Sequence, residues 1–265
     1  MEEFKPSYEN YRKILKTIRK SGKCMDYWEA KTSDKFLVLR HDIEFSVERA
    51  YKMAMIEKEE GIISTYFLQI ESNSYNAFSE KNKTFLYGII NAGHHIGLHY
   101  HLGKELSPIH VRDEIRDQIR IMSEMLRYQV DRFSIHRPVE QSQYYKIAID
   151  GIINAYSKEF FTHITDVTEN SVLEVKYIAD SKHRWNYGYP DSDTIENHPK
   201  IQLLIHPYSW AEEEADEFEM FNQLANEKEV EILNTFDEET KIYKLVKKEL
   251  EAKRGIKNEI SRNSI

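Results

Sequence analysis

The chain has 265 residues, enough for one large α/β domain or two small ones with a substantial buried core. Its formal net charge of -8 argues against a nucleic-acid backbone as a partner. The single Cys24 excludes an intramolecular disulfide and a cysteine-rich zinc site, so any metal must be held by histidine and carboxylate ligands.

The first twenty residues are charged and contain no apolar run of signal-peptide length. No uninterrupted apolar span of roughly eighteen residues occurs anywhere in the sequence. We therefore expect a cytoplasmic protein without a transmembrane segment.

The first half of the chain alternates between helix and strand patterns. Apolar side chains spaced three or four residues apart predict an amphipathic helix over 5–21. An apolar run predicts a strand over 35–41 that is buried on both faces and leads into Arg40, His41, Asp42, Ile43 and Glu44. Capping residues and periodicity predict four more elements, namely a helix over 46–60, a strand over 62–70, a helix over 79–93 and a strand over 96–101.

The second half continues this alternation. Ser107-Pro108 is a typical helix start, and the apolar spacing that follows predicts a long helix to about residue 129. The remaining expected elements are a strand over 132–136, a helix over 144–154, and strands over 160–164, 175–179 and 201–205. About seven βα-like units without an internal repeat predict an α/β fold with a single barrel-like parallel sheet.

We expect a single domain over 1–265 with three parts. These are an N-terminal helical segment (1–34), the barrel core (35–210), and C-terminal helices with a polar tail (211–265). Residues 211–227 are acidic and helical in pattern, and 242–253 form a mixed-charge helix. Such charge runs are most simply solvated helix faces, although they leave room for a homo-oligomer.

Four histidines lie within eight positions in the stretch Gly93-His94-His95-Ile96-Gly97-Leu98-His99-Tyr100-His101. Neutral imidazole is the commonest protein ligand for metals such as zinc, and the apolar neighbours indicate a buried setting. The stretch therefore predicts a metal site. The simpler alternative is that some of these are core histidines bonded to the backbone.

Reactive residue types follow four of the predicted strands. They are Asp42 and Glu44, then His99 and His101, then His136 and Arg137, and finally His206. Ends of parallel strands meet at one rim, so these groups are expected to line one pocket. One carboxylate with two imidazoles is a ligand set for zinc, iron, cobalt or nickel that leaves positions open for water and substrate.

This arrangement predicts hydrolysis of an amide or ester. A metal lowers the pKa of bound water and polarises a carbonyl, while a nearby carboxylate takes the proton from the attacking water. His206 is then the expected proton donor to the leaving group, and Arg137 keeps the carboxylate ionised. The alternative for Asp42 is a turn or capping role before Ser46, and the alternative for His136 is packing beside Pro138.

The ordered motifs resemble the polysaccharide deacetylase (NodB homology) family, which is carbohydrate esterase-like, and more closely its branch with a His-Asp-x-Asp/Glu first motif. The motifs are Arg40-His41-Asp42-Ile43-Glu44, Gly93 to Tyr100, His136-Arg137-Pro138 and Leu204-Ile205-His206-Pro207. The resemblance spans roughly residues 35–210. It implies a distorted (β/α) barrel of about seven strands and metal-dependent removal of acetyl groups from N-acetylated sugars.

The resemblance also implies a role for each matching position. Asp42 matches the catalytic base, and Glu44 matches the acidic metal ligand. His99 matches the first histidine of the family's His-x-x-x-His motif. Arg137 matches the arginine that orients the base, and His206 matches the general acid. Asp180-Ser181 and Trp185 fall where the family has its fourth motif. Gly103 stands at the second motif histidine, so His101, or else His95, becomes the candidate third ligand.

Tyr100, His136 and Trp185 are the candidate substrate-binding residues, although aromatic side chains also commonly belong to the core. The favoured function is a zinc-dependent deacetylase of an N-acetylated sugar or glycan precursor, with iron, cobalt or nickel as alternative metals. Two other functions stay open: a hydrolase of a non-sugar C–N amide bond on the same fold, or an inactive barrel that binds a glycan or a partner protein.

Overall fold

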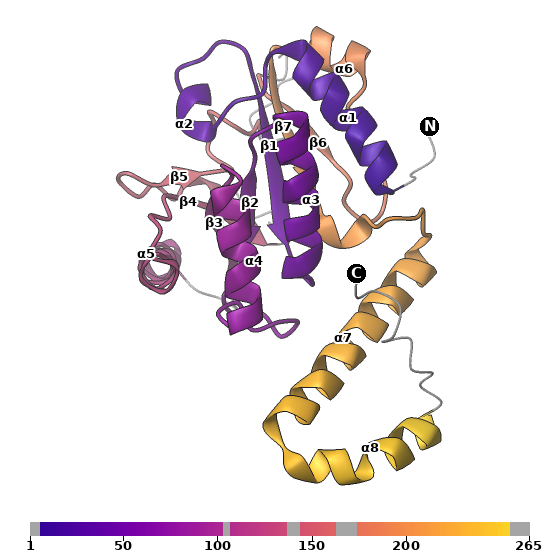
Figure 1. Ribbon diagram of the computed structural model, residues 1–265. Helices are drawn as coiled ribbons and strands as arrows, with labels where there is room; N and C mark the ends of the chain where they lie inside the picture. The colour runs from indigo at the N-terminus through magenta and orange to yellow at the C-terminus, as the bar shows by residue number, and fades with distance from the viewer. Residues whose placement is uncertain (1–5, 103–106, 137–143, 163–173, 255–265) are drawn as a thin grey trace. The chain divides into compact units, whose positions relative to one another are not determined.

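The computed structural model describes residues 6–102, 107–136, 144–162 and 174–254, and the chain divides into two compact units, 1–217 and 218–265. The first unit contains a curved sheet of seven strands in the order β5-β4-β3-β2-β1-β7-β6 (Figure 1). Every neighbouring pair is parallel. The predicted α/β fold, a distorted barrel of about seven parallel strands, is confirmed; within the described residues it stays open between β5 and β6.

The elements have the following bounds. The strands are β1 (Phe36–Ile43), β2 (Thr65–Leu68), β3 (His95–His101), β4 (Arg132–His136), β5 (Ile153–Asn154), β6 (Lys176–Ala179) and β7 (Lys200–Ile205). The helices are α1 (Tyr8–Ser21), α2 (Tyr27–Ala30), α3 (Val47–Glu60), α4 (Glu80–Asn91), α5 (Pro108–Leu126), α6 (Ser192–Asn197), α7 (Glu217–Glu239) and α8 (Lys241–Arg254), with 3-10 turns at Tyr144–Lys146 and Pro207–Ser209.

Capping residues set the ends of the helices as the sequence predicts. The Ser46 side chain accepts a hydrogen bond from the Arg49 amide at the start of α3. Gly61 ends this helix with a φ of 68°, a left-handed conformation that costs glycine little. Ser79 caps α4 in the same manner, and Ser107 caps α5 ahead of Pro108.

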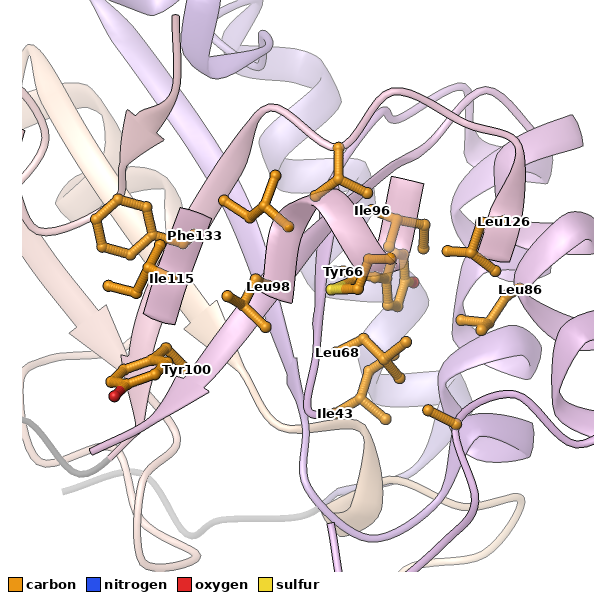
Figure 2. Packing of buried hydrophobic residues seen from close by; sticks show 14 of the residues in the cluster. Ile43, Tyr66, Leu68, Leu86, Ile96, Leu98, Tyr100, Ile115, Leu126 and Phe133 are labelled. Carbon is orange, nitrogen blue, oxygen red and sulfur yellow. The ribbon is translucent and has the colours of Figure 1, made fainter. Parts of the chain in front are cut away.

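Helices α1, α3 and α4 lie side by side over the outer face of the sheet, with α3 in the middle (Figure 1). Figure 2 shows the core beneath them, where Leu68, Ile96 and Leu98 from β2 and β3 pack with Leu86 of α4 and Ile115 of α5. All five are fully buried. Burying each such side chain stabilises the fold by about 1.5–3 kcal/mol.

The inner face of the sheet has its own core. Phe36 and Val38 of β1 point into the barrel and pack with Phe67 of β2. Gly97 of β3 is required here, because an added Cβ would lie 2.6 Å from the Phe67 ring and 2.8 Å from the Arg132 side chain. The absent side chain lets Phe67 fill the barrel below the strand ends.

A buried polar cluster lies on the outer face, between the sheet and α1 and α3. Glu57 of α3 is fully buried, and its carboxylate accepts hydrogen bonds from Ser64 at 2.6 Å and Tyr66 at 2.8 Å, and another from Tyr11. His41 completes the cluster, with Nε2 2.6 Å from Glu57 and Nδ1 3.0 Å from the Ile205 carbonyl oxygen. Both ring nitrogens of His41 therefore have a polar partner inside the cluster.

Two predictions for the segment between β4 and β6 differ from the structure. The helix predicted over 144–154 is wrong, because Gly151, with a φ of 75°, forms a turn that leads into β5. The Asn154 side chain fixes this turn by donating to the carbonyl oxygens of Tyr145 and Ile147. Of the strand predicted over 160–164, residues 160–162 are not a strand, and the rest lies outside the described residues.

The described part of the second unit, up to residue 254, forms two helices, as the sequence predicts. Helix α7 begins at Glu217 rather than at residue 211 and continues to Glu239, and α8 follows after a single residue, Thr240. The division between the units lies close to the predicted boundary at 211, while a single domain over 1–265 stays a prediction. Within the described ranges, no helix is both long and apolar enough to span a membrane.

Candidate active site

The carboxyl end of β1 places two acidic side chains at the mouth of the barrel. Asp42 is 3% exposed and lies inside, where Arg40 donates to both of its carboxylate oxygens at 2.9 and 2.8 Å. Burial opposes ionisation of Asp42, but the positive charge of Arg40 and its hydrogen bonds hold the pKa of this carboxyl well below the ordinary value. Asp42 is therefore an ionised carboxylate in a fixed orientation.

Arg40 is itself fully enclosed in the barrel. Its guanidinium group lies 4.6 Å from the centre of the Tyr156 ring and 5.3 Å from that of Phe67, and Nη2 also donates to the Tyr156 hydroxyl at 3.0 Å. A buried arginine with planar partners on several sides has few alternative orientations. The position of Asp42 therefore depends on the residues around Arg40.

Glu44, His99 and His136 form a group from three strand ends. The Nδ1 atom of His136 lies 3.1 Å from Glu44 Oε1 and 3.1 Å from His99 Nε2, and one ligand atom from each residue lies within 4.8 Å of the others. Ligand atoms around a tetrahedral zinc ion, at bond lengths of about 2.0–2.1 Å, lie roughly 3.3 Å apart. The spacing of this group fits a metal ion of that size.

The protonation states of His99 and Glu44 also fit a metal ion. Burial lowers the pKa of His99 to about 4, so the ring is neutral near pH 7. Its Nδ1 lies 2.7 Å from Ser134 Oγ, and in the tautomer with the proton on Nδ1 the lone pair of Nε2 is directed at the group. Burial opposes ionisation of Glu44, but its hydrogen bond with His136 and the positive charge of His206 lower the pKa of this carboxyl. Two imidazoles and a carboxylate are thus available as ligands.

Asp42 lies beside this group, with Oδ2 3.6 Å from His99 Nε2.

A second polar pair joins the ends of β6 and β7 at the same mouth of the barrel. His206 Nδ1 donates to Asp180 Oδ1 at 2.6 Å, and Trp210 Nε1 donates to Asp180 Oδ2 at 2.9 Å. Burial alone would lower the pKa of His206, but Asp180, with help from Glu44 and Asp42, raises it to about 9. His206 is therefore protonated at neutral pH.

The structure brings together Asp42, Glu44, His99, His136 and His206 from the predicted set. His101 is exposed at the end of β3, with its ring 5.2 Å from that of His136, and it is not part of the ligand group. His95 lies at the opposite end of the strand, 3.5 Å from Asp26. Four residues along a strand span about 13 Å, so His95 is too far from His99 to share a metal.

Two predicted substrate-binding residues are buried among other side chains. Tyr100 is 1% exposed and lies in the outer core with Ile115 of α5 (Figure 2). Its hydroxyl donates to Glu114 of the same helix. Side chains alternate along a strand, so Tyr100 faces away from His99. Trp185 is 9% exposed and packs against Trp210 and Tyr189, which leaves it little surface for a ligand.

Arg137 lies outside the described residues. Ser134 is the residue that the sequence analysis missed, although it precedes His136 by two positions and so shares its face of β4. The two residues whose roles changed are Arg40, which holds Asp42, and His136, which joins the ligand group.

No family model and no curated protein matches the sequence. Solved structures with partial likeness include a CE4 family pseudoenzyme from Bacillus anthracis, at 17% identity and a TM-score of 0.44, covering 74% of this chain and 61% of that chain. A family 4 acetyl xylan esterase from Clostridium thermocellum, solved with a cobalt ion, matches at 13% identity and a TM-score of 0.40, covering 64% of this chain and 73% of that chain. A peptidoglycan N-acetylglucosamine deacetylase matches at 17% identity and a TM-score of 0.41, covering 76% of this chain and 84% of that chain. The chain spans less than two thirds of the length of the pseudoenzyme.

Proposed function

We propose that this protein is a metal-dependent hydrolase that removes an acetyl group from an N-acetylated sugar or glycan precursor. One observation carries the proposal. Glu44, His99 and His136 converge as metal ligands beside an ionised Asp42 that Arg40 holds in place. A site built only for stability does not require two buried imidazoles that converge with a carboxylate in this way.

In this proposal Glu44 Oε1, His99 Nε2 and His136 Nδ1 would hold the metal, with His136 in place of His101. Zinc is the first candidate, since it accepts nitrogen and oxygen ligands in a tetrahedral site with one open position. When bound, such a metal polarises the acetyl carbonyl and lowers the pKa of water. Ser134 has the supporting role of fixing the ring of His99.

Asp42 is the proposed general base. It takes one proton from the attacking water as the new C–O bond forms at the acetyl carbon. Arg40 positions the carboxylate by occupying both of its oxygens, so proton transfer requires one of these hydrogen bonds to loosen. A fixed base of this kind reduces the entropy that must be lost on the way to the transition state.

His206 is the proposed general acid. It gives its Nε2 proton to the sugar nitrogen as the C–N bond breaks, so the products are acetate and a free amine. Asp180 occupies Nδ1 and thereby selects the nitrogen that faces the substrate. Because the pKa of His206 is about 9, the ring carries the proton that this step requires.

The sugar substrate is inferred from the ordered motifs that resemble the polysaccharide deacetylases. The cytoplasmic location expected from the sequence stays a prediction. Acetate release from N-acetylglucosamine oligomers tests the function, using protein purified without chelator or nickel affinity. We expect metal-dependent turnover that Asp42→Asn abolishes while metal content stays the same.

Two results would contradict the proposal. Hydrolysis of simple amides but not of acetylated sugars would favour a non-sugar substrate. Glycan binding without turnover, in protein that contains about one metal ion per chain, would favour an inactive binding barrel.

A further inference from the structure

The unit formed by residues 218–265 exposes an unusual amount of apolar surface. Phe218, Ile232 and Phe236 of α7 are 81, 46 and 41% exposed. On α8 the corresponding values are 68% for Ile242, 81% for Leu245 and 48% for Val246. Soluble proteins rarely leave large side chains open in such a group unless the surface has a binding partner.

These side chains form a stripe on each helix. Phe218, Ala225, Ile232 and Phe236 are separated by seven, seven and four residues, which places them on one face of α7 over a length of about 27 Å. Phe221, which is 52% exposed, lies at the same face by its spacing. Ile242, Leu245 and Val246 occupy one face of α8 at spacings of three and four. The stripes have the pattern of helices that pack in a bundle.

The two helices carry opposite net charge. Helix α7 has eight acidic residues and one lysine, for a net charge of -7. Helix α8 has six basic and two acidic residues, for a net charge of +4. Pairing α7 with another α7, or α8 with another α8, brings like charges together, whereas pairing α7 with α8 brings opposite charges together.

The two helices of one chain cannot bury most of each other's apolar stripes. Antiparallel helical hairpins use loops of about two to five residues, and here only Thr240 separates α7 from α8. Two close contacts lie at this corner, the Phe236–Tyr243 ring contact and the ion pair of Lys247 with Asp237 at 3.0 Å. From the corner the helices diverge (Figure 1). Most of the α7 stripe is therefore beyond the reach of its own α8.

We propose that the apolar stripes of α7 and α8 are the interface with a second copy of this chain. In the dimer, α7 of each protomer packs against α8 of its partner, so that a twofold axis generates two identical α7–α8 contacts. The apolar stripes supply the burial, and the opposite helix charges select this pairing over its alternatives. The inference is independent of the proposed hydrolase activity.

Sedimentation equilibrium of the full chain over a wide concentration range tests the proposal. We expect the mass of a dimer at high concentration, and a monomer for both Ile232→Glu and Leu245→Glu. Ile109→Glu, at a similarly exposed apolar position on α5 (62%), is the matched control and should remain dimeric. Far-ultraviolet circular dichroism checks that each variant keeps its helices. A wild-type monomer at every concentration would overturn the proposal, as would a dimer insensitive to both stripe variants.

Charge reversal tests the pairing without touching apolar residues. Lys241→Glu, Lys244→Glu and Lys248→Glu together should weaken dimerisation at least about tenfold at low salt, or about 1.4 kcal/mol, because α8 then carries the same sign as α7. An unchanged dissociation constant of the dimer would mean that the helix charges do not select the pairing.

Cross-linking identifies which helices meet. In a Cys24→Ser background, one preparation carries Ala225→Cys on α7 and a second carries Lys244→Cys on α8. A short bis-maleimide should link two chains efficiently only when the preparations are mixed. Efficient linking of the Ala225→Cys chain to itself would show that α7 pairs with α7, and would overturn the proposed pairing.

Discussion

Arg40 and Asp42 lie two residues apart on β1, face the same side of the strand, and are joined by two hydrogen bonds inside the barrel. An arginine from the same strand thus positions the carboxylate at the centre of the candidate site. The resemblance to the deacetylases had implied Arg137 for this role, and Arg137 lies outside the described residues.

Replacing Arg40 should separate positioning from metal binding. Arg40→Lys keeps the positive charge but loses the paired hydrogen bonds, so we expect kcat to fall about 10²-fold while metal content stays at the wild-type level. Steady-state kinetics and elemental mass spectrometry on the same preparation check this. Unchanged kcat would mean that Asp42 does not depend on Arg40. The exposed pair-forming Arg120 provides the control Arg120→Lys.

Metal content distinguishes the two candidate third ligands. His136→Ala should lower the metal from about one ion per chain to a small fraction, because it removes one of three ligand atoms. His101→Ala should leave the metal content unchanged, since His101 is exposed and outside the ligand group. The opposite pattern would restore His101 as the ligand that the sequence alone favoured.

The pH dependence of turnover should report on His206. The acid must be protonated, so activity should decline as pH rises through its pKa of about 9. Asp180→Asn removes the main charge that raises this pKa, and burial then favours the neutral ring. We expect the alkaline limb of the profile to move to lower pH in Asp180→Asn, whereas a limb that stays in place would assign it to another group.

The buried cluster around Glu57 should control stability in acid. Burial opposes ionisation of Glu57, but the charge and hydrogen bond of His41 lower its pKa to about 2, from an ordinary value of 4.5. A lowered carboxylate pKa contributes stability above the ordinary value, and that stability is lost as pH falls from about 4.5 toward 2. Denaturant unfolding at several pH values should show this decline.

Glu57→Gln tests the same cluster at neutral pH. The variant removes a buried carboxylate charge that lies 2.6 Å from His41 Nε2 and accepts hydrogen bonds from the Ser64 and Tyr66 hydroxyls, so we expect a loss of about 3 kcal/mol in the free energy of unfolding. Glu59→Gln, on the same helix but exposed, should change it by less than about 0.5 kcal/mol. Equal effects in the two variants would mean that the buried charge contributes little.

The sequence predicted the sheet and the rim of the barrel well, because both follow from local patterns. Ser46 and Gly61 bound α3 by capping rules, and the apolar run of β1 places Asp42 at a strand end. The same alternation rule would have turned Tyr100 away from the site, had it been applied to each residue of β3. The helix predicted over 144–154 failed because the Gly151 turn outweighed the apolar spacing.

The grouping of His136 with Glu44 and His99 could not be predicted from the sequence, because it depends on the register between two strands. His99 is level with Ser134, and His101 is level with His136. The His136 side chain reaches across to His99, whereas His101 is exposed at the strand end. Such a relationship is set by the three-dimensional arrangement of the strands. The same holds for Glu57 and His41, which are 16 residues apart and meet only after α3 packs on the sheet.

Strand β1 contributes to two separate polar clusters. Arg40 and Asp42 lie on its inner face in the candidate site, and His41 lies on its outer face in the cluster around Glu57. The strand should therefore tolerate conservative substitutions far better than any change in its length. Deleting one residue before Arg40 would rotate each side chain to the opposite face, moving His41 into the barrel and two charged groups against Glu57. In a library of single-residue deletions, we expect positions 36–39 to be among the least tolerant in the chain.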